Sequence, residues 1–166
     1  MDVEPRDKSH RGNASQFFVA GELCRRGYAA VVTLGNTPNT DVLCSNRSGT
    51  RFAHIQVKTF VPGTKTCSVG LKAERVFGPG FFWVIAGIPE PGSTLPFRYF
   101  VVPSAEMAAN VSEQHRRWLS EPGMKGQQRK DSKVRAVAVS ANASPYFWNI
   151  EQYEDRWELI EAVLQG

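Results

Sequence analysis

The chain has 166 residues, of which 42% are hydrophobic and 22% charged, and its formal net charge is +4. This length is enough to bury the core of one domain, and the composition is ordinary for a globular protein. No apolar run reaches the roughly 18 residues of a membrane helix, and the polar residues 1–11 do not form a signal peptide. The three cysteines lack zinc-type spacing and are expected to be reduced, so the composition favours a cytoplasmic location.

The N-terminal region is expected to contain an arm followed by a helix. Residues 1–12 are interpreted as a flexible arm, and residues 13–166 as a single domain. Apolar residues then recur at helical spacing, which predicts a helix from a cap at Asn13 or Ser15 to about Arg26.

The middle of the chain predicts strands. Residues 28–33 are β-branched and apolar, and residues 41–45 and 51–60 form two strands of a hairpin around a polar turn. The continuous apolar run 81–88, bounded by glycine and proline, is typical of a buried central strand, and another strand is predicted at 97–102. Between 60 and 81 the chain is a variable insert, with a short strand at 68–72 and a helical turn at 73–77. This order predicts an α/β fold with a mixed central sheet flanked by helices.

The C-terminal third predicts helices around a polar loop. A helix is expected to start at a Ser104 cap, with a second segment at 112–120, and residues 121–133 are expected to form a loop. A strand is expected at 134–139 and a last helix at 151–164. Four apolar residues would line one face of that helix and pack in the core: Tyr153, Trp157, Ile160 and Leu164.

The hairpin carries the most informative chemistry. Side chains alternate along a strand, so Gln56 and Lys58 share one face of the predicted sheet, and the hairpin can bring Asp41 opposite them. The Asp41 carboxylate, the Gln56 side-chain oxygen and the Val57 carbonyl are hard oxygen ligands suited to Mg²⁺. Lys58 can hold a water molecule and stabilise an anionic transition state. Glu22 lies on the preceding helix, where it could reach this site directly or through a water molecule.

These motifs resemble the PD-(D/E)XK nuclease superfamily, which has the restriction-endonuclease-like αβββαβ core. Residues 17–28 are similar to the first helix of the family, Thr40-Asp41-Val42 to its metal-binding strand, and Gln56-Val57-Lys58 to its (D/E)-x-K element in a Q-x-K form. The resemblance implies that Asp41 and Gln56 hold a Mg²⁺ or Mn²⁺ ion, that Lys58 is the catalytic lysine, and that Glu22 is an auxiliary carboxylate and metal ligand. It also implies hydrolysis of DNA.

Two departures from the family pattern concern the metal site. Position 40 is threonine rather than the proline that often precedes the aspartate, and Gln56 replaces an acid, which removes one negative charge. The alternatives for the single residues are structural: Asp41 can anchor a turn, and Lys58 and Glu22 can be ordinary exposed residues.

A basic segment follows the predicted 112–120 helix. Between His115 and Arg135 there are seven basic residues against two acidic ones, which indicates either a polyanion partner or a solvated loop. Six of these are candidate nucleic-acid-binding residues: Arg116, Arg117, Lys125, Arg129, Lys130 and Lys133.

The leading hypothesis from the sequence is a metal-dependent endonuclease that hydrolyses phosphodiester bonds in DNA. The alternative is a catalytically degenerate member of the same fold that binds nucleic acid or protein without cutting. No membrane partner is expected, and the resemblance implies that two chains can act as a homodimer.

Overall fold

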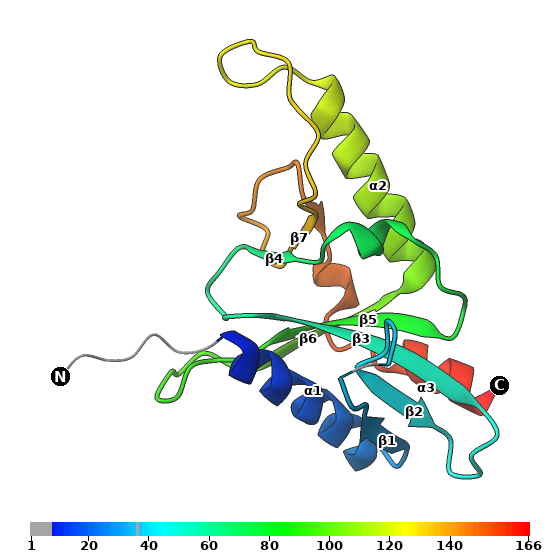
Figure 1. Ribbon diagram of the computed structural model, residues 1–166. Helices are drawn as coiled ribbons and strands as arrows, with labels where there is room; N and C mark the ends of the chain where they lie inside the picture. The colour runs from blue at the N-terminus through cyan, green and yellow to red at the C-terminus, as the bar shows by residue number, and fades with distance from the viewer. Residues whose placement is uncertain (1–7, 36) are drawn as a thin grey trace.

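The fold is built around one five-stranded sheet (Figure 1). The computed structural model describes residues 8–35 and 37–166. The strands lie in the order β1-β2-β3-β5-β6, and all neighbours are antiparallel except β3 and β5, which are parallel. Their bounds are β1 Ala29–Val32, β2 Val42–Ser45, β3 Phe52–Phe60, β5 Phe81–Gly87 and β6 Arg98–Pro103. The predicted α/β fold with a mixed central sheet flanked by helices is confirmed.

The predicted buried strand is the centre of the molecule. All seven residues of β5 are buried, because helices or further strands cover both faces of the sheet. Covered on both sides, a strand loses the alternation of polar and apolar residues and becomes a continuous apolar run.

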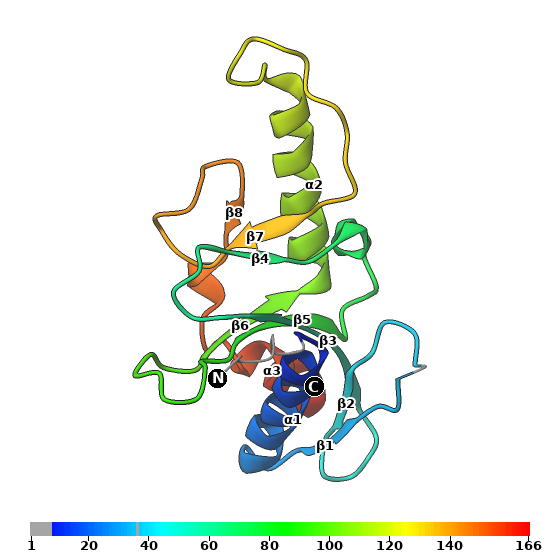
Figure 2. The ribbon, with the colours of Figure 1, turned by 60° about the vertical axis from the view of Figure 1, so that its left-hand side comes forward.

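Two layers cover the faces of the sheet (Figures 1 and 2). Helices α1 (Lys8–Arg25) and α3 (Glu158–Gln165) pack on one face, with Val19, Leu23 and Ile160 in the core. Helix α2 (Ser104–Ser120) and a small sheet cover the other face. The small sheet has the order β4-β7-β8, formed by Thr66–Ser68, Ala136–Ala138 and Trp148–Asn149.

The crossover from β3 to its parallel neighbour β5 contains β4 and the 3₁₀ helix η1 (Leu71–Glu74). Both elements begin about two residues earlier than the predicted strand at 68–72 and helical turn at 73–77. Helix η1 packs against α2, and its Ala73 side chain is fully buried.

The prediction of a flexible arm over residues 1–12 is wrong for residues 8–12, because α1 begins at Lys8. Residues 1–7 lie outside the described part of the chain. Ser15 is not a cap; it lies inside α1, where its hydroxyl donates to the Gly12 carbonyl at 2.7 Å and hydrogen-bonds Thr59 of β3 at 2.6 Å. The first buried residue of α1 is Ser15, so the apolar spacing that predicts the helix does not extend to residues 8–12.

Two predictions about the later helices are also wrong. Helix α2 is continuous, and its first residue, Ser104, uses its hydroxyl to accept a bond from the Phe77 N–H at 2.8 Å instead of capping the helix. The last helix is split into η2 (Glu151–Tyr153) and α3, with Asp155 between them at a φ of 53°. The break sends Trp157 to the core under α1, whereas Tyr153 packs against the core under α2.

The three cysteines are free thiols. Cys44 and Cys67 are buried, and burial raises the pKa of each thiol to about 12, which excludes a reactive thiolate. Cys24 is exposed, and Cys67 lies in β4. No helix in the described residues is long and apolar enough to cross a bilayer.

Candidate functional site

The backbone of Asp41 is held from two sides at the start of β2. Its N–H donates to the Ile55 carbonyl of β3 at 2.8 Å, and its carbonyl accepts from the Thr33 N–H, after β1, at 2.9 Å. The position of Asp41 is therefore set by the sheet and not by the loop that precedes it.

The Asp41 carboxylate continues the strand pairing where β2 stops. The register pairs Val42–Ser45 with residues 52–55 only, so the rest of β3 extends past its neighbour. One carboxylate oxygen, Oδ2, accepts the Val57 N–H at 2.8 Å and also a bond from the Gln56 side-chain nitrogen. No hydrogen bond from a described residue reaches the other carboxylate oxygen, Oδ1.

Strand β3 divides its side chains between the two faces as predicted. Ile55 and Val57 are buried against α1, and Thr59 on the same face bonds Ser15 of α1. Gln56 and Lys58 therefore lie on the opposite face, toward the small sheet and η1.

Asp41, Gln56 and Lys58 line one cavity of about 470 Å³. Its other walls are the loop residues 37–39 and the segment from Val69 to Lys72. The structure thus brings the three residues of the predicted hairpin motif together and adds a second cation, Lys72, which the sequence did not single out.

Burial is the main influence on the Asp41 carboxylate and raises its pKa above the ordinary value. The Val57 N–H, the charges of Lys58 and Lys72 and the Gln56 amide oppose this effect without cancelling it. Burial removes part of the hydration of the ionised carboxylate, so a cation bound next to it would stabilise the charged form.

The donor atoms of the site fit a hard divalent cation. No group of three or more His, Cys, Asp or Glu side chains suited to a metal exists among the described residues. Mg²⁺, however, is commonly held by one or two carboxylates together with water and substrate phosphate. Asp41 Oδ1 meets the first requirement. The Val57 carbonyl points to the same side of β3 as its N–H, toward Asp41. Coordination by Gln56 requires its amide to turn, because its nitrogen now faces Asp41.

Glu22 does not line this cavity. Its carboxylate accepts bonds from Arg25 at 2.7 Å and from Arg26 at 2.8 Å, and Arg26 also contacts Glu161 of α3. The Arg25 hydrogen bond is the largest influence on the pKa of Glu22, which is lowered. Helix α1 covers the face opposite Gln56 and Lys58, so the structure does not bring Glu22 together with them.

The basic segment is ordered by local contacts. Arg116 pairs with Glu113, and Arg117 pairs with Glu121 at 3.1 Å. The Arg129 guanidinium lies 5.0 Å from the Trp118 ring centroid and 4.5 Å from that of Tyr146. Three of the six candidates are exposed, with no ion pair to any described residue: Lys125, Lys130 and Lys133.

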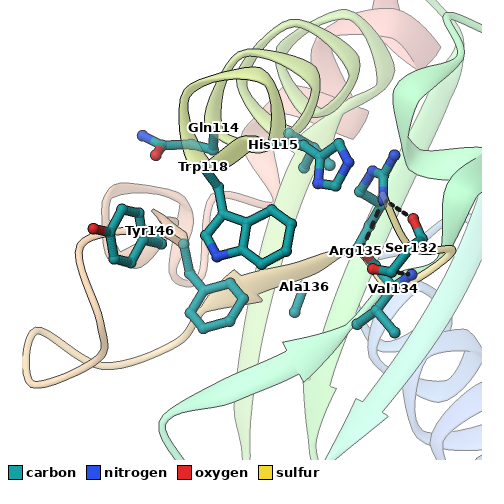
Figure 3. A pocket seen from close by; sticks show the side chains of 10 residues that line it. Gln114, His115, Trp118, Ser132, Val134, Arg135, Ala136 and Tyr146 are labelled. Carbon is teal, nitrogen blue, oxygen red and sulfur yellow. Dashed lines mark hydrogen bonds between the residues drawn. The ribbon is translucent and has the colours of Figure 1, made fainter. Parts of the chain in front are cut away.

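Figure 3 shows the root of this segment, where it returns to the domain. Trp118 stacks on His115, and Arg135 donates to the carbonyls of Ser132 and Val134 at 2.7 and 2.9 Å. Arg135 is buried and also pairs with Glu74 of η1. The basic segment is therefore anchored to the element that carries Lys72.

His54 lies on the same face as Gln56, next to the cavity. Its Nδ1 is 3.2 Å from the Thr40 hydroxyl, and it lines a neighbouring hollow bounded by Gly78, Pro79 and Gly80. His54 thus supports the turn before Asp41 and does not line the cavity itself.

Comparisons with known proteins support the fold. The chain matches no protein-family model, and no curated protein is similar in sequence. Among solved structures it is similar to the bacterial homing endonuclease I-Ssp6803I, with a TM-score of 0.56 and 12% sequence identity over 97% of this chain and 96% of that one. The similarity shows that this chain and the homing endonuclease share an α/β fold.

Proposed function

We propose that this protein is a metal-dependent endonuclease that hydrolyses phosphodiester bonds in DNA. The observation that carries the proposal is the convergence of Asp41, Gln56 and Lys58 in one cavity, on a fold similar to that of a homing endonuclease. The PD-(D/E)XK assignment, in its Q-x-K form, belongs to this proposal.

The residues of the cavity would have two separate roles, metal binding and orientation of the attacking water. Asp41, the Gln56 side-chain oxygen and the Val57 carbonyl would hold Mg²⁺ or Mn²⁺, which supplies positive charge at the scissile phosphate and lowers the pKa of bound water. Lys58 orients the attacking water and stabilises the charge on the phosphate oxygens. The water oxygen bonds to phosphorus and gives up a proton to solvent, the bond to the leaving sugar oxygen breaks, and that oxygen takes up a proton from solvent.

Changing Lys58 to alanine is the direct test of this proposal. We expect Lys58→Ala to lower the rate of DNA cleavage in Mg²⁺ by about 100- to 1000-fold, because it removes a cation placed at the developing charge. The measurement is nicking of supercoiled plasmid, with Lys65→Ala as control, since Lys65 is exposed and outside the cavity. Equal cleavage by the wild-type protein and Lys58→Ala would remove the proposed mechanism.

The basic segment is proposed to bind duplex phosphates away from the cleavage site. Helix α2 has 17 residues and projects from the sheet with the basic loop at its end (Figure 1). At ~1.5 Å per residue it spans about 25 Å, which corresponds to roughly seven base pairs of DNA. Lys125, Lys130 and Lys133 are the groups best placed for this contact, because no described carboxylate neutralises them.

We expect the triple change Lys125→Ala/Lys130→Ala/Lys133→Ala to weaken DNA binding and to flatten its salt dependence. Each phosphate contact contributes roughly 0.9 to the slope of log K against log salt, so the slope should fall by about 3. Fluorescence anisotropy at several salt concentrations measures it. The matched control changes Arg47, Arg51 and Lys65, which carry the same charge outside this segment. An unchanged slope in the first variant would assign the lysines to a solvated loop instead.

The alternative function is binding without cleavage. It is favoured by Gln56, which replaces an acid and here presents its nitrogen to Asp41. Calorimetry with Mg²⁺ and with Mn²⁺ separates the two functions: DNA binding with no metal uptake and no cleavage supports the degenerate member. The homodimer stays a prediction, for which sedimentation with and without DNA is the measurement.

A further inference from the structure

A second lysine, on an element other than the hairpin, also lines the cavity of the proposed site. Lys72 lines the same 470 Å³ space as Asp41, Gln56 and Lys58, but it comes from η1 and not from the hairpin. Because these four residues line one space, a ligand held there by the hairpin residues is also next to Lys72.

The backbone that carries Lys72 is held firmly. The N–H groups of Val69 and Gly70 both donate to the Arg135 carbonyl, at 2.8 and 3.2 Å, and Ala73 is fully buried. Glu74 of the same 3₁₀ helix pairs with the Arg135 guanidinium. The backbone of Lys72 is therefore fixed beside the cavity, and its exposed side chain can extend toward a ligand there.

The charge balance of the cavity favours an anion. Among the described residues that line it, two ammonium groups stand against a single carboxylate, and the rest of the lining is neutral. No carboxylate within residues 8–35 and 37–166 forms an ion pair with Lys72. An unpaired ammonium at a site that already holds Lys58 is suited to a second phosphate oxygen.

We propose that Lys72 is a phosphate-binding residue, which contacts the substrate backbone from η1 and completes a two-lysine subsite with Lys58. The ligand class is a phosphodiester of the DNA strand that enters the cavity. This inference rests on the proposed nuclease function, and it adds a contact that lies outside the hairpin motif.

The test compares Lys72→Ala, Lys72→Arg and Lys65→Ala. Lys65 precedes β4 in the same crossover and is exposed, but it does not line the cavity. We expect Lys72→Ala to lower kcat/KM by about 10- to 100-fold and to reduce the salt slope by about 1, because one phosphate contact is lost. Lys72→Arg should keep most of the activity, and Lys65→Ala should stay within about twofold of the wild type.

A chemical probe separates a phosphate contact from a general structural role. Duplexes with one neutral methylphosphonate, placed in turn at each position near the cut, remove the charge that a lysine would bind. At one position, the methylphosphonate should lower the cleavage rate of the wild-type protein but not that of Lys72→Ala. Two results would overturn the inference. One is that each methylphosphonate lowers the cleavage rate by the same factor in Lys72→Ala as in the wild type, at every position. The other is that Lys72→Ala has the same salt slope as the wild type.

The outcomes distinguish this inference from the proposed function. If the wild type cleaves DNA, Lys58→Ala does not, and Lys72→Ala cleaves at the wild-type rate, the inference about Lys72 is wrong and the proposed function stands. If the wild type cuts no DNA, the proposed function fails. Binding of the same duplexes, measured by anisotropy for Lys72→Ala against Lys65→Ala, then still decides whether Lys72 contacts a phosphate.

Discussion

Asp41→Asn should abolish cleavage and at the same time make the protein more stable. The expected loss of cleavage rate is about 1000-fold or more, because the only carboxylate that lines the described cavity would lose its charge. Asparagine keeps an oxygen that can accept the Val57 N–H, so the end of the β2–β3 ladder stays intact. Removal of a buried charge should raise Tm in the absence of metal.

The pH dependence of this stability difference follows from the sign of the pKa change. Burial raises the pKa of Asp41 in the folded protein, so the native state binds a proton more readily than the unfolded chain does. The wild type therefore loses stability as the pH rises from the unfolded pKa through the folded one. The asparagine side chain in Asp41→Asn does not titrate. Its advantage should be largest near neutral pH and should vanish in acid, where Asp41 is protonated.

Thermal unfolding with and without Mg²⁺ supplies a second measurement that does not depend on cleavage. Mg²⁺ should raise the Tm of the wild type by mass action and leave that of Asp41→Asn unchanged. The control is Asp155→Asn, which changes an acid outside the cavity. If Asp41→Asn is less stable than the wild type at neutral pH, the charged carboxylate stabilises the turn before β2. The expectation that this buried charge lowers the stability of the protein would then be wrong.

Arg135→Met should destabilise the protein by about 2–3 kcal/mol. The Arg135 side chain is only 5% exposed, and its loss leaves Glu74 and the carbonyls of Ser132 and Val134 without their donor. Breaking a fully buried pair costs about 3–5 kcal/mol, and Glu74 is partly exposed, which places the expected value below that range. For a chain of this size the change corresponds to a decrease in Tm of roughly 5–10 °C.

Urea unfolding of Arg135→Met and Arg156→Met provides the comparison. Arg156 also pairs with a nearby acid, Glu158, but both side chains are about half exposed, so its removal should change stability by less than about 0.5 kcal/mol. Arg135→Met should also weaken the salt dependence of DNA binding, because it releases the basic segment. Equal unfolding curves for the two variants would show that Arg135 does not anchor that segment.

The hairpin site was predictable because its residues are close in sequence and lie on paired strands. Gln56 and Lys58 are two residues apart, so strand geometry alone puts them on one face, and the neighbouring strand supplies Asp41. The central strand at 81–88 was equally predictable, since an uninterrupted apolar run of that length requires cover on both sides. Glu113 with Arg116, and Arg117 with Glu121, also have the spacing of helical ion pairs, although no pairing was predicted for them.

The rest depended on tertiary packing that a periodic pattern does not contain. Helical spacing identifies the apolar face of α1, but not the face of the sheet on which it packs, and that choice separates Glu22 from Lys58. The 4-3-4 spacing in 151–164 suits one helix, yet Tyr153 and Trp157 belong to different cores, and a left-handed Asp155 makes the change of direction. Lys72 lies in the variable insert, where no motif indicated a partner.

The two backbone hydrogen bonds of Asp41 allow the loop before it to vary without moving the carboxylate. Because Ile55 and Thr33 hold Asp41 through main-chain atoms, we expect replacements at residues 35 and 37–39 to leave the strand register unchanged. These residues also line the cavity. If the proposed function holds, related sequences should differ here first, so that substrate preference can change while Asp41, Gln56 and Lys58 are retained.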